Sequence, residues 1–140
     1  MASPFFRLEL LVDGGPEQVW ARLWDLDRHT ASVPLTRVGS DDGALRHGSR
    51  FVARTTVGPI GFDDVMVVDG WEPPSLAAIT KCGRLLTGTI TVELAAEGER
   101  TRVVWTQHYG ARGVPDRAAA LVRPVVAAGY RRSLRAILAP

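Results

Sequence analysis

The sequence contains one cysteine and no long hydrophobic run, which exclude an intramolecular disulfide and a membrane-spanning helix respectively. The single Cys82 cannot form an intramolecular disulfide, which agrees with a reducing compartment. No stretch of about 18 consecutive apolar residues occurs, so no membrane span is expected. Residues 1–7 lack the basic and apolar segments of a secretory signal. We therefore predict a cytoplasmic location.

Motifs for common chemistry are also missing. The chain has no glycine-rich phosphate loop, Cys-x-x-Cys pair, Gly-x-Ser-x-Gly elbow or His-Glu-x-x-His helix. These absences remove the usual nucleotide, zinc and hydrolase interpretations, so we predict no metal and no cofactor. The formal net charge is only +2, and the arginines near the C-terminus are not interleaved with aromatic residues. Nucleic acid is therefore not an expected partner.

The residues that are present favour one domain over 1–140, because a chain of 140 residues that is 46% hydrophobic is long enough to bury a core. An amphipathic first strand is predicted over residues 5–12, where apolar and charged side chains alternate. Turn signals, the first over residues 39–43, then separate six extended runs whose even spacing predicts an antiparallel sheet. These runs are 35–39, 50–57, 60–71, 76–82, 85–95 and 101–110.

Helices are predicted at both ends of the chain. The first begins at about Pro16, which suits the first position of a helix, and a second short turn covers residues 25–29. A single long helix is predicted over about 116–138 from its alanine content and period, with a kink at Pro124. Its inward face is predicted from the outward placement of the arginines, and consists of Ala119, Val122, Val126, Tyr130, Ser133 and Ile137.

Strand alternation predicts which side chains face inward. Apolar walls with a few hydrogen-bonding groups are typical of a ligand site. We expect small residues at Ala53, Gly88 and Gly129 to leave room for a ligand. The candidate ligand-binding residues on the strands and on the terminal helix are Phe51, Thr55, Trp105, Gln107, Tyr109, Val126 and Tyr130.

Charged and imidazole side chains supply two further candidates. In a regular strand, one carboxylate of the Asp63-Asp64 pair must point inward. An Asp64 that is buried near Arg54 or Lys81 would be a functional candidate, and a bulge that exposes both carboxylates is the alternative. His29 lies near the expected entrance, where a general base is one interpretation and a surface histidine is the favoured one. The sequence identifies no catalytic residue.

Several short segments carry a family resemblance when they are taken in order. They are Pro16–Trp20, Asp27-Arg28, Gly48–Phe51, Trp71–Leu76, Thr101–Trp105 and Arg132–Leu134. Together they resemble the START-like (Bet v 1-like, SRPBCC) superfamily, specifically its polyketide cyclase/dehydrase-type branch. The resemblance implies an α+β helix-grip fold. This fold is a curved antiparallel sheet of six to seven strands, with two short helices near the N-terminus and one long C-terminal helix over a cavity.

Three functions stay open at this point. The leading hypothesis is the binding of a hydrophobic or aromatic small molecule, such as a lipid, a polyketide or an isoprenoid-like compound, in the cavity. The second is a polyketide cyclase or dehydrase that acts on a ligand in the same cavity. The third is a protein-interaction module, and a homodimer is compatible with each of them.

Overall fold

The computed structural model describes residues 4–40 and 43–140, so part of the turn predicted over 39–43 lies outside the described residues. Seven strands and four helices follow one another in this part of the chain. The strands are β1 (Phe5–Asp13), β2 (Thr36–Ser40), β3 (Arg50–Val57), β4 (Ile60–Glu72), β5 (Leu76–Cys82), β6 (Leu86–Glu97) and β7 (Arg100–Ala111). The helices are α1 (Pro16–Leu23), α2 (Leu26–Ser32), α3 (Asp116–Leu121) and α4 (Arg123–Ile137).

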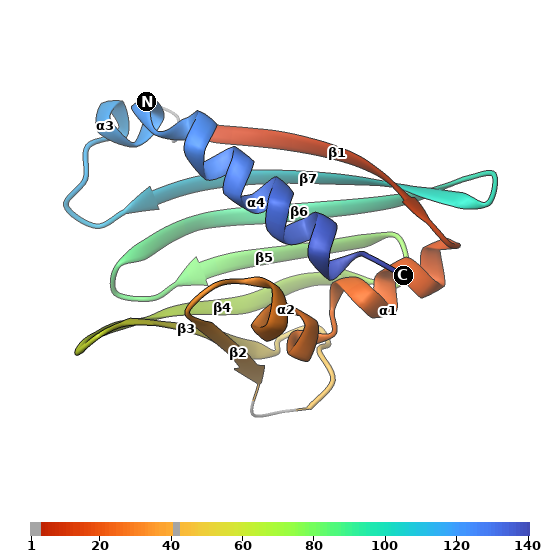
Figure 1. Cartoon of the computed structure of the whole chain (residues 1–140), viewed down its shortest axis with the longest axis horizontal. Coiled ribbons are helices and arrows are strands. Elements are labelled where there is room, and N and C mark those ends of the chain that lie inside the picture. Colours follow the sequence, from red (N-terminus) through yellow and green to blue (C-terminus); the bar gives the residue numbers. More distant parts are fainter. Residues whose placement is uncertain (1–3, 41–42) are drawn as a thin grey trace.

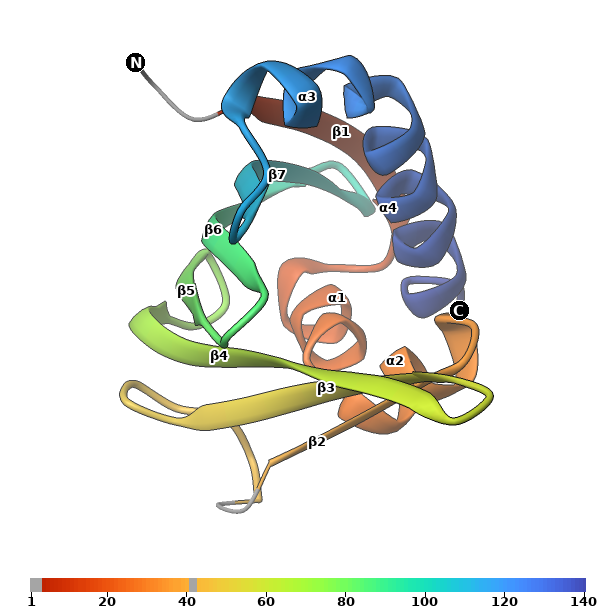
Figure 2. The same cartoon turned by 90° about the vertical axis from the view of Figure 1, so that its left-hand side faces the viewer.

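All seven strands form one antiparallel sheet in the order β1-β7-β6-β5-β4-β3-β2. The sheet curls strongly, and α4 lies across its concave face (Figures 1 and 2). The helices α1 and α2 connect β1 to β2, which are the two edges of the sheet. This arrangement confirms the predicted helix-grip fold and its antiparallel pairing.

Alternation of side chains explains why these segments pair as strands. In β1 every second residue is buried, and Phe6, Leu8 and Leu10 face the core while Arg7 and Glu9 face solvent. The same period buries alternate residues along β7 from Thr101 to Tyr109. A shift of one residue would move each apolar set to solvent, so this pattern fixes the register.

The first two helices close one end of the curled sheet. Helix α1 begins at Pro16 as predicted, and the backbone N–H of Gly15 donates to Gln18 Oε1 at 3.2 Å. Helix α2 begins after Asp25, whose carboxylate accepts from the backbone N–H two residues later. The guanidinium of Arg28 donates to the carbonyl oxygens of Ile137 and Ala139 at 2.9 and 2.7 Å. These bonds tie α2 to the end of α4.

The C-terminal segment differs from the prediction of one kinked helix. Two helices are present, and the break lies at Val122 between α3 and α4. Pro124 has no N–H, and its ring would clash with the carbonyl four residues earlier, so it lies in the first turn of a new helix, α4, rather than at a kink within one helix. Because the helix breaks at Val122, this side chain is exposed rather than inward. No helix in the described ranges is long and apolar enough to span a membrane.

Candidate functional site

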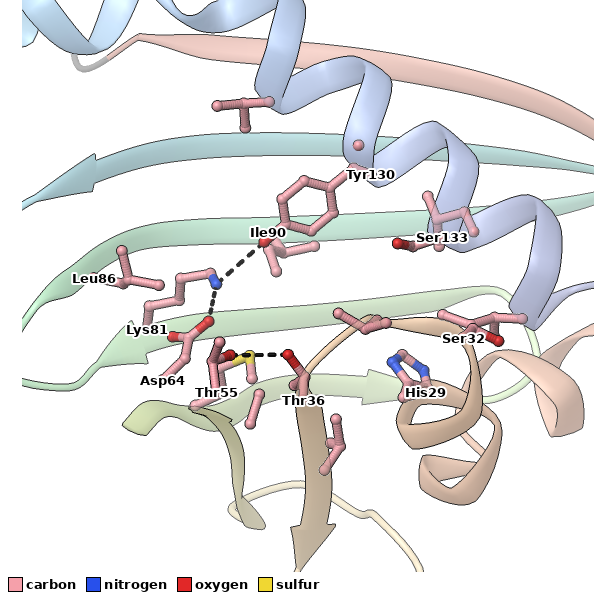
Figure 3. Close-up of a pocket in the computed structure, with 18 of the residues that line it drawn as sticks. His29, Ser32, Thr36, Thr55, Asp64, Lys81, Leu86, Ile90, Tyr130 and Ser133 are labelled. Carbon is pink, nitrogen blue, oxygen red and sulfur yellow. Dashed lines mark hydrogen bonds and ion pairs between the residues drawn. The ribbon is translucent and has the colours of Figure 1, made fainter. Parts of the chain in front are cut away.

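A cavity of about 650 Å³ lies between α4 and the concave face of the sheet. This volume falls within the range of about 300–1,000 Å³ that is usual for small-molecule sites. Figure 3 shows side chains from α2, the sheet and α4 converging on it. Most of the wall is apolar, and its apolar residues on the sheet include Phe51, Phe62, Met66, Ile79, Ile90 and Trp105.

One part of the cavity wall carries an ion pair. The ammonium of Lys81 on β5 contacts the carboxylate of Asp64 on β4 (Figure 3). Only 4% of the Lys81 side chain and 10% of the Asp64 side chain are exposed. The neighbouring carboxylate, Asp63, points to the opposite face and pairs with Arg54 at 2.9 Å in solvent. The strand is therefore regular at this point, and Lys81 rather than Arg54 is the partner of Asp64.

Tyr130 joins the ion pair to a polar network that crosses from the helix to the sheet. Its ring points from α4 into the cavity, and its hydroxyl accepts from Lys81 Nζ at 3.3 Å (Figure 3). The same hydroxyl accepts from Gln107 Nε2 at 3.1 Å, while Gln107 Oε1 accepts from the indole N–H of Trp105 at 3.0 Å. The phenol is therefore held between donors from β5 and β7.

Opposing effects act on the protonation of Lys81. Burial favours the neutral amine, but the interactions with Tyr130 and Asp64, which include a hydrogen bond from the ammonium to each of them, outweigh it and raise the pKa of Lys81 above its ordinary value. Lys81 is therefore an ammonium at neutral pH. Since Asp64 is its direct partner, the pair has no net charge.

His29 lies on the cavity wall rather than on the outer surface favoured from the sequence. Its Nε2 lies 2.6 Å from the carbonyl oxygen of Leu23, so this nitrogen is the donor and carries the hydrogen. Burial lowers the pKa of His29, although the bond to Leu23 and the charge of Asp25 oppose this shift. A neutral imidazole therefore faces the cavity at neutral pH.

The structure brings together most of the predicted ligand-binding residues and leaves two out. Phe51, Thr55, Asp64, Trp105, Val126 and Tyr130 line the cavity. Gln107 faces inward as predicted but is buried below Tyr130, and it does not reach the cavity wall. Tyr109 is also inward and away from this wall, because its hydroxyl donates to the carbonyl oxygen of Ala119 in α3 at 2.8 Å. Strand alternation predicted that the side chains of Gln107 and Tyr109 face inward, but it did not predict which residues would cover them.

The expectation that small residues leave room holds at Ala53 and Gly129, which line the cavity, but not at Gly88. Gly88 has a φ of +135°, and a Cβ there would lie 1.9 Å from the carbonyl oxygen of His108. Its lack of a side chain therefore serves the close pairing of β6 with β7, not the cavity.

Lys81 is a candidate functional residue that was not predicted from the sequence as a site residue in its own right. It appeared there only as one possible partner of Asp64. The signal was present, because Ala77, Ile79 and Lys81 alternate along β5 with a period of two and are all buried. The only lysine of the chain thus occupies an inward position that an apolar residue would ordinarily take.

The fold and the cavity define a class of protein: a helix-grip domain of the START-like, Bet v 1-like kind, with a hollow that is apolar except at one polar cluster. The chain belongs to the family described as polyketide cyclase/dehydrase and lipid transport, whose model matches residues 6–139. No protein with a curated description matches the sequence.

Solved structures resemble the fold at low sequence identity. The ZhuI aromatase/cyclase from Streptomyces sp. R1128 is 18% identical with a TM-score of 0.74, over 96% of this chain and 91% of that one. The Mll3558 protein from Rhizobium loti is 20% identical with a TM-score of 0.74, over 96% of each chain. Ara h 8.0201 is 11% identical with a TM-score of 0.71, over 98% of this chain and 99% of that one.

Proposed function

We propose that this protein binds a hydrophobic or aromatic small molecule in the cavity between α4 and the sheet. The observation that carries the proposal is the hollow itself, because about 650 Å³ of mostly apolar space is left open where an ordinary core would be close-packed. The proposed ligand contacts include the predicted residues that line the cavity, namely Phe51, Thr55, Asp64, Trp105, Val126 and Tyr130.

A neutral fluorescent probe, N-phenyl-1-naphthylamine, tests this proposal. It should bind the folded protein, and the melting temperature should rise as the probe concentration increases, since a ligand that binds only the folded state stabilises it. Gly129→Leu places a side chain into the cavity from α4, where nothing lies within 4 Å of the added Cβ, and should weaken probe binding strongly. The matched control is Ala128→Leu, which adds the same side chain at an exposed neighbour outside the cavity wall. Equal binding by both variants, or no binding by the parent, would contradict the proposal.

A second candidate function is catalysis of the cyclase or dehydrase type in the same cavity. The polar cluster favours it, because Tyr130 is a phenol that contacts an ammonium and could act as an acid. If Tyr130 transfers a proton in the reaction, Tyr130→Phe should lower turnover by about 10²–10⁴-fold and leave binding nearly unchanged. A change confined to affinity would instead favour the binding function.

Three further expectations from the sequence concern the domain organisation, the location and the oligomeric state. We infer that residues 1–140 act as one domain, that the protein is cytoplasmic and that a homodimer is compatible with binding. The support for the second is the lone, exposed thiol of Cys82, which has no internal partner. Cell fractionation tests the location, limited proteolysis tests the single domain, and the mass in solution by light scattering tests the dimer.

A further inference from the structure

The hydrogen bonds of the polar cluster run in one order from donor to acceptor, because both ends of the Gln107 side-chain amide have defined partners. Its Oε1 accepts from the indole N–H of Trp105 at 3.0 Å, and an indole nitrogen can only donate. The other end of the amide is therefore the NH₂ group, which donates to the hydroxyl of Tyr130 at 3.1 Å. Gln107 and Trp105 are both buried, so this orientation is held within the core.

Tyr130 receives a second hydrogen bond from Lys81, whose ammonium also can only donate. The phenol oxygen thus accepts from two groups, and neither of them can take the hydrogen of the phenol. Among the described residues, the O–H of Tyr130 has no acceptor. Since Tyr130 lines the cavity, this hydrogen is available to a ligand there (Figure 3).

Within the cluster formed by Asp64, Lys81 and Tyr130, the carboxylate of Asp64 offers the cavity no free acceptor. Asp64 Oδ2 is occupied by the ammonium of Lys81, and Asp64 Oδ1 is enclosed by protein and has no partner among the described residues. Beyond the cluster, the hydroxyl of Thr36 donates to the carbonyl oxygen of Pro34 at 3.0 Å and accepts from the hydroxyl of Thr55 at 2.9 Å, so neither hydroxyl has a hydrogen left to donate to a ligand. Lys81 and Asp64 cancel in charge, and Arg132, the other charged residue on the cavity wall, is solvent-exposed. An ionised ligand group at the cluster itself would therefore lie in a site of low polarity without a free counter-ion beside it.

We propose that Tyr130 is the specificity-determining donor of the cavity, and that its O–H, oriented by Gln107 and Lys81, donates to a carbonyl oxygen of an uncharged aromatic ligand. The inference rests on the proposed binding function, since it requires a ligand in the cavity. The cationic neighbour strengthens this donor, because a hydrogen bond to the phenol oxygen polarises its O–H. Gln107 and Lys81 act as positioning residues, and the apolar wall takes the rings of the ligand.

Two naphthalene probes of nearly equal shape test the inference. One is 2-acetyl-6-(dimethylamino)naphthalene, and the other carries an ethyl group in place of the acetyl group. The parent protein should bind the ketone more tightly than the ethyl compound by about 2- to 12-fold, the range of one neutral hydrogen bond. The carbonyl stretch of the bound ketone, measured by isotope-edited infrared spectroscopy, should move to lower frequency than in an aprotic solvent.

Tyr130→Phe removes only the hydroxyl and should abolish both the preference for the ketone and the shift of the carbonyl stretch. Tyr109→Phe is the matched control, because it alters the only other tyrosine of the chain, whose hydroxyl is occupied by Ala119 and lies away from the cavity wall. It should leave both readouts unchanged. A third probe, 6-(dimethylamino)-2-naphthoic acid, is ionised at pH 7 and should bind more weakly than the ketone.

The outcomes separate this inference from the binding function on which it rests. If neither neutral probe binds the parent protein, the binding function itself fails. If both bind equally, if Tyr130→Phe keeps the preference, or if the acid binds most tightly, the cavity is a binding site but Tyr130 does not select a neutral carbonyl. Should Tyr130→Phe fail to fold, an unshifted carbonyl stretch in the parent protein alone would still overturn the inference.

Discussion

Removing Lys81 should destabilise the protein far more than breaking an ordinary ion pair. In Lys81→Met, the carboxylate of Asp64 stays buried with 10% of its side chain exposed and without its cationic partner. Breaking one side of a buried pair costs about 3–5 kcal/mol. A domain is ordinarily stable by about 5–15 kcal/mol, so this loss is a large fraction of the total.

A matched control lies on the opposite face of the same sheet. Arg54 and Asp63 are directly paired between β3 and β4, one position from Asp64, and about half of each side chain is exposed. Arg54→Met should therefore cost no more than about 1 kcal/mol. Replacing the buried pair together, as Lys81→Met with Asp64→Leu, leaves no unpaired charge and should be much less harmful than Lys81→Met alone.

Equilibrium unfolding in urea measures each free energy by linear extrapolation. Since the pKa of Lys81 is raised in the folded state, the stability from its charge is fully present below the ordinary lysine pKa of about 10.4 and is lost as the pH rises through the folded value. The contribution of the Lys81 charge to the stability difference between the parent and the double variant should therefore be lost in that alkaline range. A cost for Lys81→Met equal to that for Arg54→Met, or a double variant as unstable as Lys81→Met, would refute the reasoning.

Three further predictions address other parts of the molecule. Gly88→Ala should disrupt the sheet, because the added Cβ would lie 1.9 Å from a backbone oxygen of β7. The Cβ of Gly129→Ala meets nothing within 4 Å, so this variant should be neutral or slightly stabilising, and thermal unfolding compares the melting temperatures of the two. Tyr109→Phe should cost about 1 kcal/mol and loosen α3, which amide exchange would detect, and unchanged protection of α3 would contradict this role. Burial lowers the pKa of His29, so the unfolded chain binds a proton more readily than the folded protein, and the free energy of unfolding should fall as the pH drops below about 6.5. His29→Gln should flatten this pH dependence, whereas His47→Gln, at an exposed position, should not. Urea unfolding at several pH values would show the difference.

Patterns that repeat along the chain predicted the fold well. The period of two in the strands gave the inward faces, and the spacing of turn signals gave the antiparallel order. Pro16 marked the start of α1, which depends only on local backbone chemistry. At the other end, Pro124 is also a local signal, but a kink and a break share the same residue, and the prediction chose the wrong one.

The cavity wall was only partly predictable, because alternation reports which face of a strand a residue occupies and not what covers it. Tyr109 and Gln107 face inward as predicted, yet α3 covers the first and Tyr130 covers the second. Lys81 was considered only as one possible partner of Asp64, because a charged residue is ordinarily placed on the outer face, whereas it is buried here.

The sequence by itself determined the helix-grip fold of this protein, since local turns and hydrophobic alternation specify strands, faces and order. Only the tertiary structure decided where the polar groups meet. Asp64 and Lys81 lie on the paired, consecutive strands β4 and β5, whereas Tyr130 lies on α4, 49 residues beyond Lys81, and reaches them because the sheet curls and α4 crosses it. The same curvature leaves the cavity open, because the distance between α4 and the strands depends on packing over the whole molecule and is not encoded in any one segment.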